Sequence, residues 1–171
     1  EYALASGEPA EVAEAIGEHY RPRGAGDEIP QPRLGRLLSV CDKLDTICAL
    51  FAVGVIPTGS ADPYGLRREA TGVVSVLRTG DPKRKALRLS LGDLIRTDLN
   101  ALGDDIQLKV PREEIAAQVM DFLGQRLQTS LLEDETPVPY DLVNAALAVG
   151  FDDVFGAAAR ANLLHILLGN P

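Results

Sequence analysis

The chain is 171 residues long, 46% of its residues are hydrophobic, and its formal net charge at pH 7 is −8. That length suits one or two domains with a real core, and no apolar run is long enough to cross a membrane, so we expect a soluble protein. The negative charge argues against a surface that is basic throughout, as a general nucleic-acid platform would be. No basic and apolar leader opens the sequence, and the missing initiator Met indicates a cut or trimmed piece of a longer protein.

The N-terminal part predicts short helices followed by a long connection. Residues 1–6 are typical of a helix end, and residues 9–20 predict a short amphipathic helix. Residues 21–33 contain Pro22 and Pro30 among several glycines, a composition that cannot hold a helix. We expect this connection to be ordered, because long loops in compact domains are often functional or tightly packed.

A long helix is predicted over residues 34–52, and it carries an acid in an apolar position. Its apolar residues recur at helical spacing and form one stripe, which we expect to face the core: Leu34, Leu37, Leu38, Cys41, Leu44, Cys48 and Ala52. Asp45 falls inside this stripe, Asp42 lies at its edge, and Lys43 points to the opposite face. Because a buried carboxylate needs a partner or a proton, Asp45 is expected to be ion-paired.

The following segment supplies a candidate partner for that acid. Residues 56–63 predict a tight loop, with Asp62 as the N-cap of the next helix. Along this helix Arg67 flanks the apolar stripe, whereas Arg68 points away from it. The pattern predicts a buried ion pair between Asp45 and Arg67, and it leaves Arg68 for solvent or an external anion.

The remaining chain also predicts helices, over residues 82–99, 111–132, 140–149 and 151–168. Glycine and proline separate them, and no segment alternates apolar and polar residues long enough to indicate a strand. We therefore expect an all-α bundle of about seven helices. Residues 1–99 would form its core, and residues 100–171 the C-terminal part of the same domain.

Positive charge gathers in residues 64–99, which contain eight Lys and Arg residues against four Asp and Glu residues. The side chains best placed to meet phosphate are predicted to be Arg68, Lys83, Arg84, Lys85 and Arg88. Phosphate contacts of this kind would fix the register of a nucleic acid without reading its bases. Charge alone favours a solvated helical face, so both interpretations stay open.

Two cysteines, Cys41 and Cys48, stand on the long helix. Seven residues at 1.5 Å each separate them by about 10 Å, which is too far for a disulfide. We expect both to be reduced core residues, as is usual in a cytoplasmic protein, and not part of a zinc site.

The motif residues resemble the β subunit of the bacterial two-subunit glycyl-tRNA synthetase. The resemblance rests on the runs CDKLDT at 41–46 and IPTGS at 56–60, followed by Asp62-Pro63 and Leu66-Arg67-Arg68. Residues 1–30 and 121–135 agree more weakly, while Cys41, Gly24 and Tyr64-Gly65 depart from the usual family residues without removing a charge. The charged motif positions are Asp42, Lys43, Asp45, Asp62, Arg67 and Arg68.

The resemblance implies an HD-like helical domain in an enzyme that attaches glycine to tRNA(Gly) using ATP and Mg. In such an enzyme the class II catalytic core lies in the separate α subunit. This segment would then hold no cofactor and no catalytic residue. Its expected work is to position tRNA and to support assembly with the α subunit, in the cytoplasm and away from any membrane.

The alternative enzyme class is the HD superfamily of metal phosphohydrolases. Their ligand set ends in an Asp within a helix, and residues 40–44, with Asp42 at the centre, look like that pattern. The chemistry also requires a His and a His-Asp doublet to hold a divalent metal, and neither His19 nor His165 precedes an Asp. We expect no metal site, and we keep a degenerate or active hydrolase and a plain helical interaction module as alternatives.

Overall fold

Eight α-helices make up the secondary structure of the described residues, which are 2–24, 26–80, 85–103 and 105–168 of the computed structural model. The helices are α1 (Tyr2–Ala5), α2 (Ala10–Glu18), α3 (Arg33–Ala52), α4 (Leu66–Arg78), α5 (Leu91–Ala101), α6 (Arg112–Leu132), α7 (Tyr140–Ala148) and α8 (Val154–Leu168). Thr58 and Ala61 form an isolated bridge, and no strand occurs in these ranges. The all-α class is confirmed, whereas its HD-like arrangement stays a prediction.

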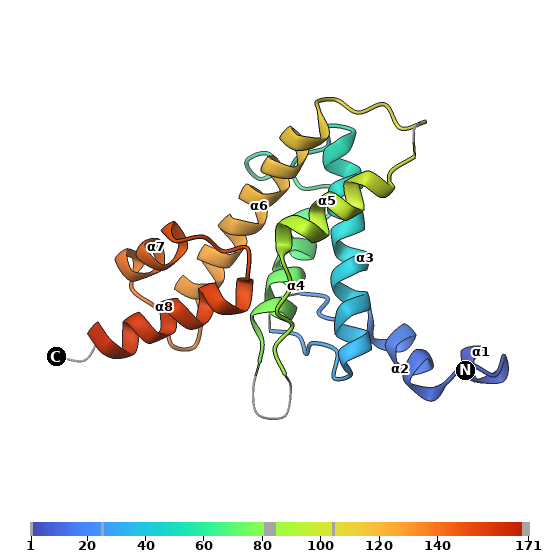
Figure 1. The fold of residues 1–171 in the computed structure, drawn as a ribbon, viewed down its shortest axis with the longest axis horizontal. Helices are drawn as coiled ribbons and strands as arrows, with labels where there is room; N and C mark the ends of the chain where they lie inside the picture. The colour runs from blue at the N-terminus through green and yellow to red at the C-terminus, as the bar shows by residue number, and fades with distance from the viewer. Residues whose placement is uncertain (1, 25, 81–84, 104, 169–171) are drawn as a thin grey trace.

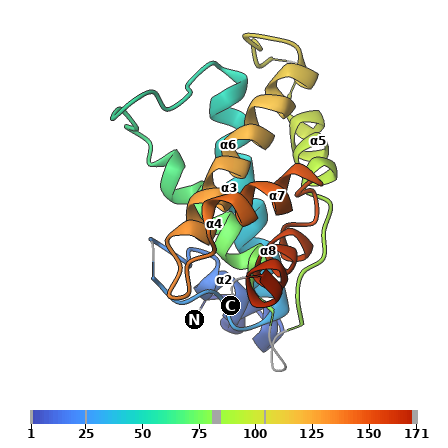
Figure 2. The same cartoon turned by 90° about the vertical axis from the view of Figure 1, so that its left-hand side faces the viewer.

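The two longest helices, α3 and α6, form the centre of the molecule together with α4 and α5 (Figure 1). The short helices α1 and α2 lie beyond the N-terminal end of α3, and α7 and α8 lie on the opposite side against α6. The connection between α3 and α4 extends away from the helices (Figure 2). Within the described residues, none of the helices combines the length and the apolar content that a bilayer span requires.

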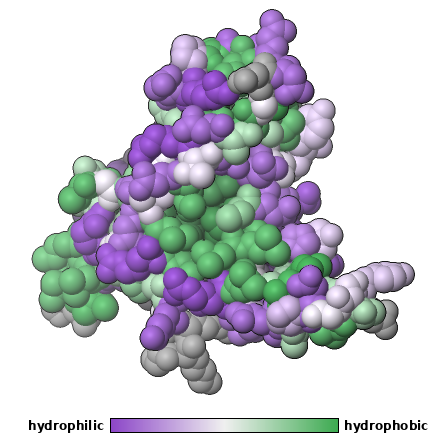
Figure 3. Space-filling view, turned by 45° about the vertical axis from the view of Figure 1, so that its right-hand side comes forward, coloured by the Kyte–Doolittle hydropathy of each residue, from purple (hydrophilic) through white to green (hydrophobic). Residues whose placement is uncertain are grey.

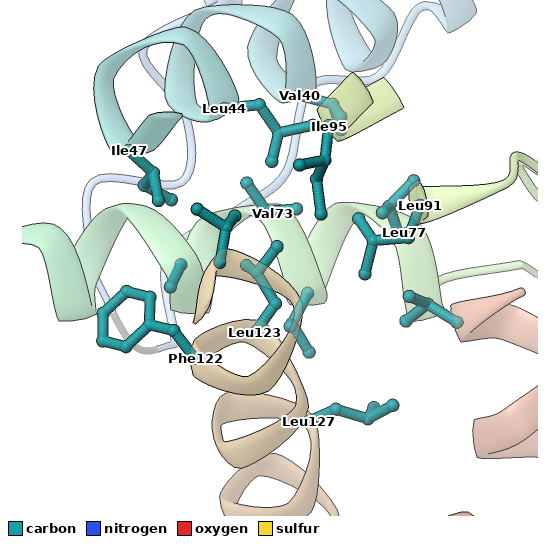
Figure 4. Close-up of a cluster of buried hydrophobic side chains, with 14 of the residues drawn as sticks. Val40, Leu44, Ile47, Val73, Leu77, Leu91, Ile95, Phe122, Leu123 and Leu127 are labelled. Carbon is teal, nitrogen blue, oxygen red and sulfur yellow. The ribbon is translucent and has the colours of Figure 1, made fainter. Parts of the chain in front are cut away.

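One continuous cluster of buried side chains joins helices α3 to α8. Figure 4 shows its centre, where Leu44 of α3, Val73 of α4, Ile95 of α5 and Leu123 of α6 point toward one another. Burying a leucine or isoleucine side chain contributes about 1.5–3 kcal/mol, so this cluster supplies most of the stabilisation. It draws on both 1–99 and 100–171, and the predicted division between these ranges stays a prediction.

Helix α4 begins later than the sequence pattern predicts, at Leu66 after Gly65, whose φ is 68°. Asp62 still performs the capping function, because its two carboxylate oxygens accept hydrogen bonds from the backbone N–H groups of Leu66 (2.8 Å) and Arg67 (3.0 Å). A carboxylate at a helix N-terminus satisfies donors that have no partner inside the helix.

The helix predicted over residues 82–99 starts too early, since α5 begins only at Leu91. Residues 82–84 lie outside the described residues, and residues 85–90 are not helical. Ser90 ends this irregular segment by capping α5, with its hydroxyl accepting from the Asp93 N–H at 3.1 Å. The side chain of Leu87 is buried and anchors this segment to the core, so an apolar residue is required here although the segment is not helical.

The core can be tested at Leu127, which is fully buried in α6. Leu127→Ala should lower the free energy of unfolding by about 2–5 kcal/mol, because the leucine side chain leaves a cavity behind. Leu163→Ala is the control: this leucine of α8 is 54% exposed, and its loss should cost no more than about 0.5 kcal/mol. Urea unfolding followed by circular dichroism measures both, and equal losses would contradict the described core.

Candidate nucleic-acid interface

Lys43, and not Asp45, is the charged motif residue that α3 buries. Lys43 is 2% exposed, whereas Asp42 and Asp45 are both exposed. The Lys43 ammonium donates to the backbone carbonyls of His19 (3.2 Å) and Arg21 (3.3 Å) and to the hydroxyl of Ser39 (3.2 Å). Burial lowers the pKa of Lys43, an effect that the nearby Glu69 and Asp42 carboxylates oppose.

The predicted stripe of α3 is confirmed at Leu44, Cys48 and Ala52, which are buried, and is wrong at Leu38, Cys41 and Asp45, which are exposed. The reason lies in the two apolar faces of α3. The face that packs into the core carries Val40, Leu44 and Ile47. The N-terminal half of the predicted stripe lies on the outer side instead, where Leu38 and Cys41 are exposed. Helical spacing identifies an apolar stripe but cannot choose between two of them.

The predicted ion pair between Asp45 and Arg67 is also wrong. Asp45 is exposed on the outer side of α3, and no ion pair joins it to any residue in the described part of the chain. Arg67 instead donates from Nη2 to the carbonyl of Gly59 at 2.8 Å. Arg67 thus ties the loop after α3 to the start of α4, a role served by a hydrogen bond to the backbone.

The predicted phosphate-binding cations do not form one cluster. Lys83 and Arg84 lie outside the described residues. Lys85 is exposed, but it follows α4, whereas Arg68 stands near the start of that helix. Thirteen residues at 1.5 Å each make α4 about 20 Å long, so the two positions are well separated. Arg88 is engaged with Asp153 through a hydrogen bond of 2.8 Å from Nε.

Ion pairs occupy Arg78, Arg88 and Arg96 of residues 64–99. Arg78 at the end of α4 pairs with Asp134 at 2.7 Å, and the Arg78 hydrogen bond lowers the pKa of that carboxyl. Arg96 pairs with Asp93 one turn earlier in α5 at 2.5 Å. Arg78 and Arg96 are thus already paired with carboxylates of this chain. The number of Lys and Arg residues in 64–99 therefore overestimates how many cations are available to an external anion.

Arg68 keeps its predicted exposure and lines a pocket of about 450 Å³ on the surface. The other residues that line it are Tyr20, Pro22, Arg23 and Glu69. Within the described ranges, neither the Arg23 nor the Arg68 side chain has a hydrogen-bond or ion-pair partner. Two guanidinium groups that share a pocket can bind a phosphate, since each offers a planar fork of N–H donors.

Tyr20 adds an aromatic surface to this pocket. Its side chain is 59% exposed, and its ring lies against that of His19 with centroids 3.9 Å apart. An exposed aromatic ring beside arginines is a surface on which an unpaired base can stack. Sequence reasoning missed Tyr20 and Arg23, although the run of Tyr20, Arg21, Pro22 and Arg23 at the start of a proline-rich loop was the available signal.

The segment around Asp42 also resembles part of a metal-binding motif. Among the described residues, no group of three or more His, Cys, Asp or Glu side chains is placed to hold a metal ion. Asp42 is exposed on α3, while His19 follows α2 and His165 belongs to α8. The expectation that this segment has no metal site stays a prediction.

Known proteins match this chain over nearly its whole length. A family model described as "Glycyl-tRNA synthetase beta subunit" matches residues 1–148. The glycine–tRNA ligase β subunit of Geobacter sulfurreducens is 45% identical over 100% of this chain and 23% of its own length. Those of Desulforamulus reducens and Halalkalibacterium halodurans are 42% and 43% identical, over 96% and 99% of this chain and 23% and 24% of their own lengths.

These matches place the helical domain among the subunits of aminoacyl-tRNA synthetases. Within that class, the chain belongs to the glycyl-tRNA synthetase β-subunit family, as its motif residues indicated. It spans about a quarter of the length of the curated relatives it matches.

The orientation of α3 can be tested by replacing Lys43 with Met. The carbonyl of His19 would lose its Lys43 donor, whereas the Arg21 carbonyl would keep the Ser39 hydroxyl as its donor, and an unpaired buried group costs about 1–3 kcal/mol. Asp45→Ala is the control and should change the free energy of unfolding by less than about 0.5 kcal/mol, because Asp45 is exposed. A larger loss for Asp45→Ala than for Lys43→Met in urea unfolding would contradict this orientation.

Proposed function

We propose that this chain works as part of a glycine–tRNA ligase, where it holds the tRNA backbone and supports the assembly of the enzyme. The supporting observation is the pocket that Arg23 and Arg68 share, in which neither guanidinium has a partner among the described residues. The chain carries a net charge of −8, and at this pocket two exposed arginines leave room for an external anion.

The chemistry of the pocket fits an RNA backbone better than a small anion. The arginines supply phosphate contacts, and the exposed Tyr20 ring offers a stacking surface beside them. Glu69, in the same pocket, would disfavour a second phosphate and accept a hydrogen bond from a sugar hydroxyl or a base. Lys85, which is exposed, and its neighbours Lys83 and Arg84 would then contact the same RNA farther along its backbone.

In this proposal the catalytic reaction takes place outside this domain. Glycine activation with ATP and Mg would take place in the separate α subunit, and this domain would bring tRNA(Gly) to it. Exposed apolar side chains on the outer end of α8, at Leu163, Ile166 and Leu167, support a role in assembly. Cys41 and Cys48 are free thiols, which suits the reducing conditions of the cytoplasm.

The tRNA-binding role is tested in the complete two-subunit enzyme with Arg23→Ala, Arg68→Ala and the double variant. Each single variant should raise the KM for tRNA by about ten-fold or more, and the double variant by about 100-fold or more, since a hydrogen bond to a charged group contributes about 1.5–3 kcal/mol. The slope of log affinity against log salt should also flatten, by about 0.9 for each lost contact with duplex backbone. ATP–pyrophosphate exchange with glycine, which needs no tRNA, should stay at the parent rate.

Arg96→Ala is the matched control, because Arg96 is also an exposed arginine and already pairs with Asp93. It removes the same charge, yet it should leave the KM for tRNA and its salt dependence unchanged. If Arg68→Ala behaves like Arg96→Ala, the pocket is a solvated surface. If Arg68→Ala abolishes pyrophosphate exchange in a folded enzyme, Arg68 belongs to the contact between subunits.

A further inference from the structure

The outer side of α3 carries an apolar surface that the helices of this domain do not cover. Its exposed residues are Leu38 and Cys41 of α3, and half-buried Leu34 and Leu37 of α3 and Leu94 of the neighbouring α5 continue it, although Leu37 and Leu94 also pack against the core; we call this surface the outer apolar face. Figure 3 shows apolar side chains gathered in the middle of this side of the molecule, with polar residues around them. A helix that is apolar on two sides is normally covered on both, so α3 is only half covered here.

Carboxylates stand at one end of the outer apolar face. Asp45 continues the exposed side of α3 one turn beyond Cys41, and Asp98 continues α5 one turn beyond Leu94. Within the described ranges neither carboxylate forms an ion pair. Oδ2 of Asp98 is buried without a hydrogen-bond partner among the described residues. Asp98 as a whole is half-buried, and two neighbouring carboxylates without an ion pair favour a cationic partner.

The pKa values of this region agree with that geometry. Burial raises the pKa of Asp98, and the charge of Asp45 adds to the increase, while a hydrogen bond from the Cys48 thiol opposes it. Burial, with a smaller effect from Asp98, likewise raises the pKa of Cys41. The end of the face therefore combines poor solvation with negative charge, and a cation placed there would relieve both.

We propose that the outer apolar face is covered by another segment of the same β-subunit polypeptide, an amphipathic helix that directs a Lys or Arg side chain to Asp98 and Asp45. The relatives are about four times as long as this chain, so most of their polypeptide is available to supply such a segment. A segment on the same polypeptide binds at an effective concentration in the millimolar range, which lets a modest apolar surface stay covered without a separate partner. The proposal is independent of the tRNA-binding pocket, which involves Arg23 and Arg68.

Cys41 makes the proposal measurable, because it is an exposed thiol on the outer apolar face, while Cys48 on the same helix is fully buried. The probe is a maleimide reagent, and labelling at each cysteine is followed by mass spectrometry of the peptides. Cys41 should react in the 171-residue chain at a measurable rate, slowed by its raised pKa, and at least about ten-fold more slowly in the full-length β subunit alone. Cys48 should stay protected in both, which shows that the domain remains folded.

A pair of variants of the full-length β subunit sharpens the experiment. Leu38→Glu places a charge in the outer apolar face at a position that is 37% exposed, and it should restore Cys41 labelling while Cys48 stays protected. Ile16→Glu is the control, since Ile16 is a comparably exposed residue of α2 at 47%. It should leave Cys41 protected.

Other results would overturn the proposal, each in its own way. Equal labelling of Cys41 in the 171-residue chain and in the full-length subunit would mean that the face is open. Protection that appears only when the α subunit is added would assign the face to that subunit. Protection in the 171-residue chain that increases with its concentration would assign the face to a second copy.

Discussion

The buried ammonium group of Lys43 is the contact that determines how α3 lies in the molecule. It joins α3 to the backbone that follows α2 through the carbonyls of His19 and Arg21. Helix α4 leaves room for it with a glycine, because a Cβ on Gly72 would lie 2.7 Å from the Lys43 Cε. If Lys43 turned outward, the His19 carbonyl would lose this donor and the space beside Gly72 would be left empty. The rotation of α3 is therefore set, and with it the face that enters the core.

The contact between Lys43 and the Arg21 carbonyl also helps to position the pocket of Arg23 and Arg68. Because the backbone at Arg21 is held against α3, the next residues run beside the start of α4, and Arg23 meets Arg68 at one pocket. Neither segment carries a recognisable binding motif by itself. Packing can also make a cation unavailable to an external anion: Arg78 is paired with Asp134, which follows α6. The cations available to an RNA backbone are thus chosen by packing rather than by their number in the sequence.

The described part of the domain leaves apolar surface uncovered in two places. Its core is complete, yet the outer apolar face and the outer end of α8 leave apolar side chains exposed. Relatives about four times as long have further polypeptide with which to cover such surfaces. In the covered form that we propose, the carboxylates of Asp45 and Asp98 would favour a cationic segment over a purely apolar one.

The sequence by itself determined what depends on neighbours along the chain. Helical periodicity predicted most helices and the all-α class, a carboxylate at Asp62 predicted the capping of α4, and the motif runs identified the family. The tertiary structure decided what depends on distant segments. It alone chose between the two apolar faces of α3, buried Lys43 in place of Asp45, and paired Arg88 with Asp153. The physical reason is that spacing along a helix fixes which residues share a face, whereas the partner of that face comes from elsewhere in the chain.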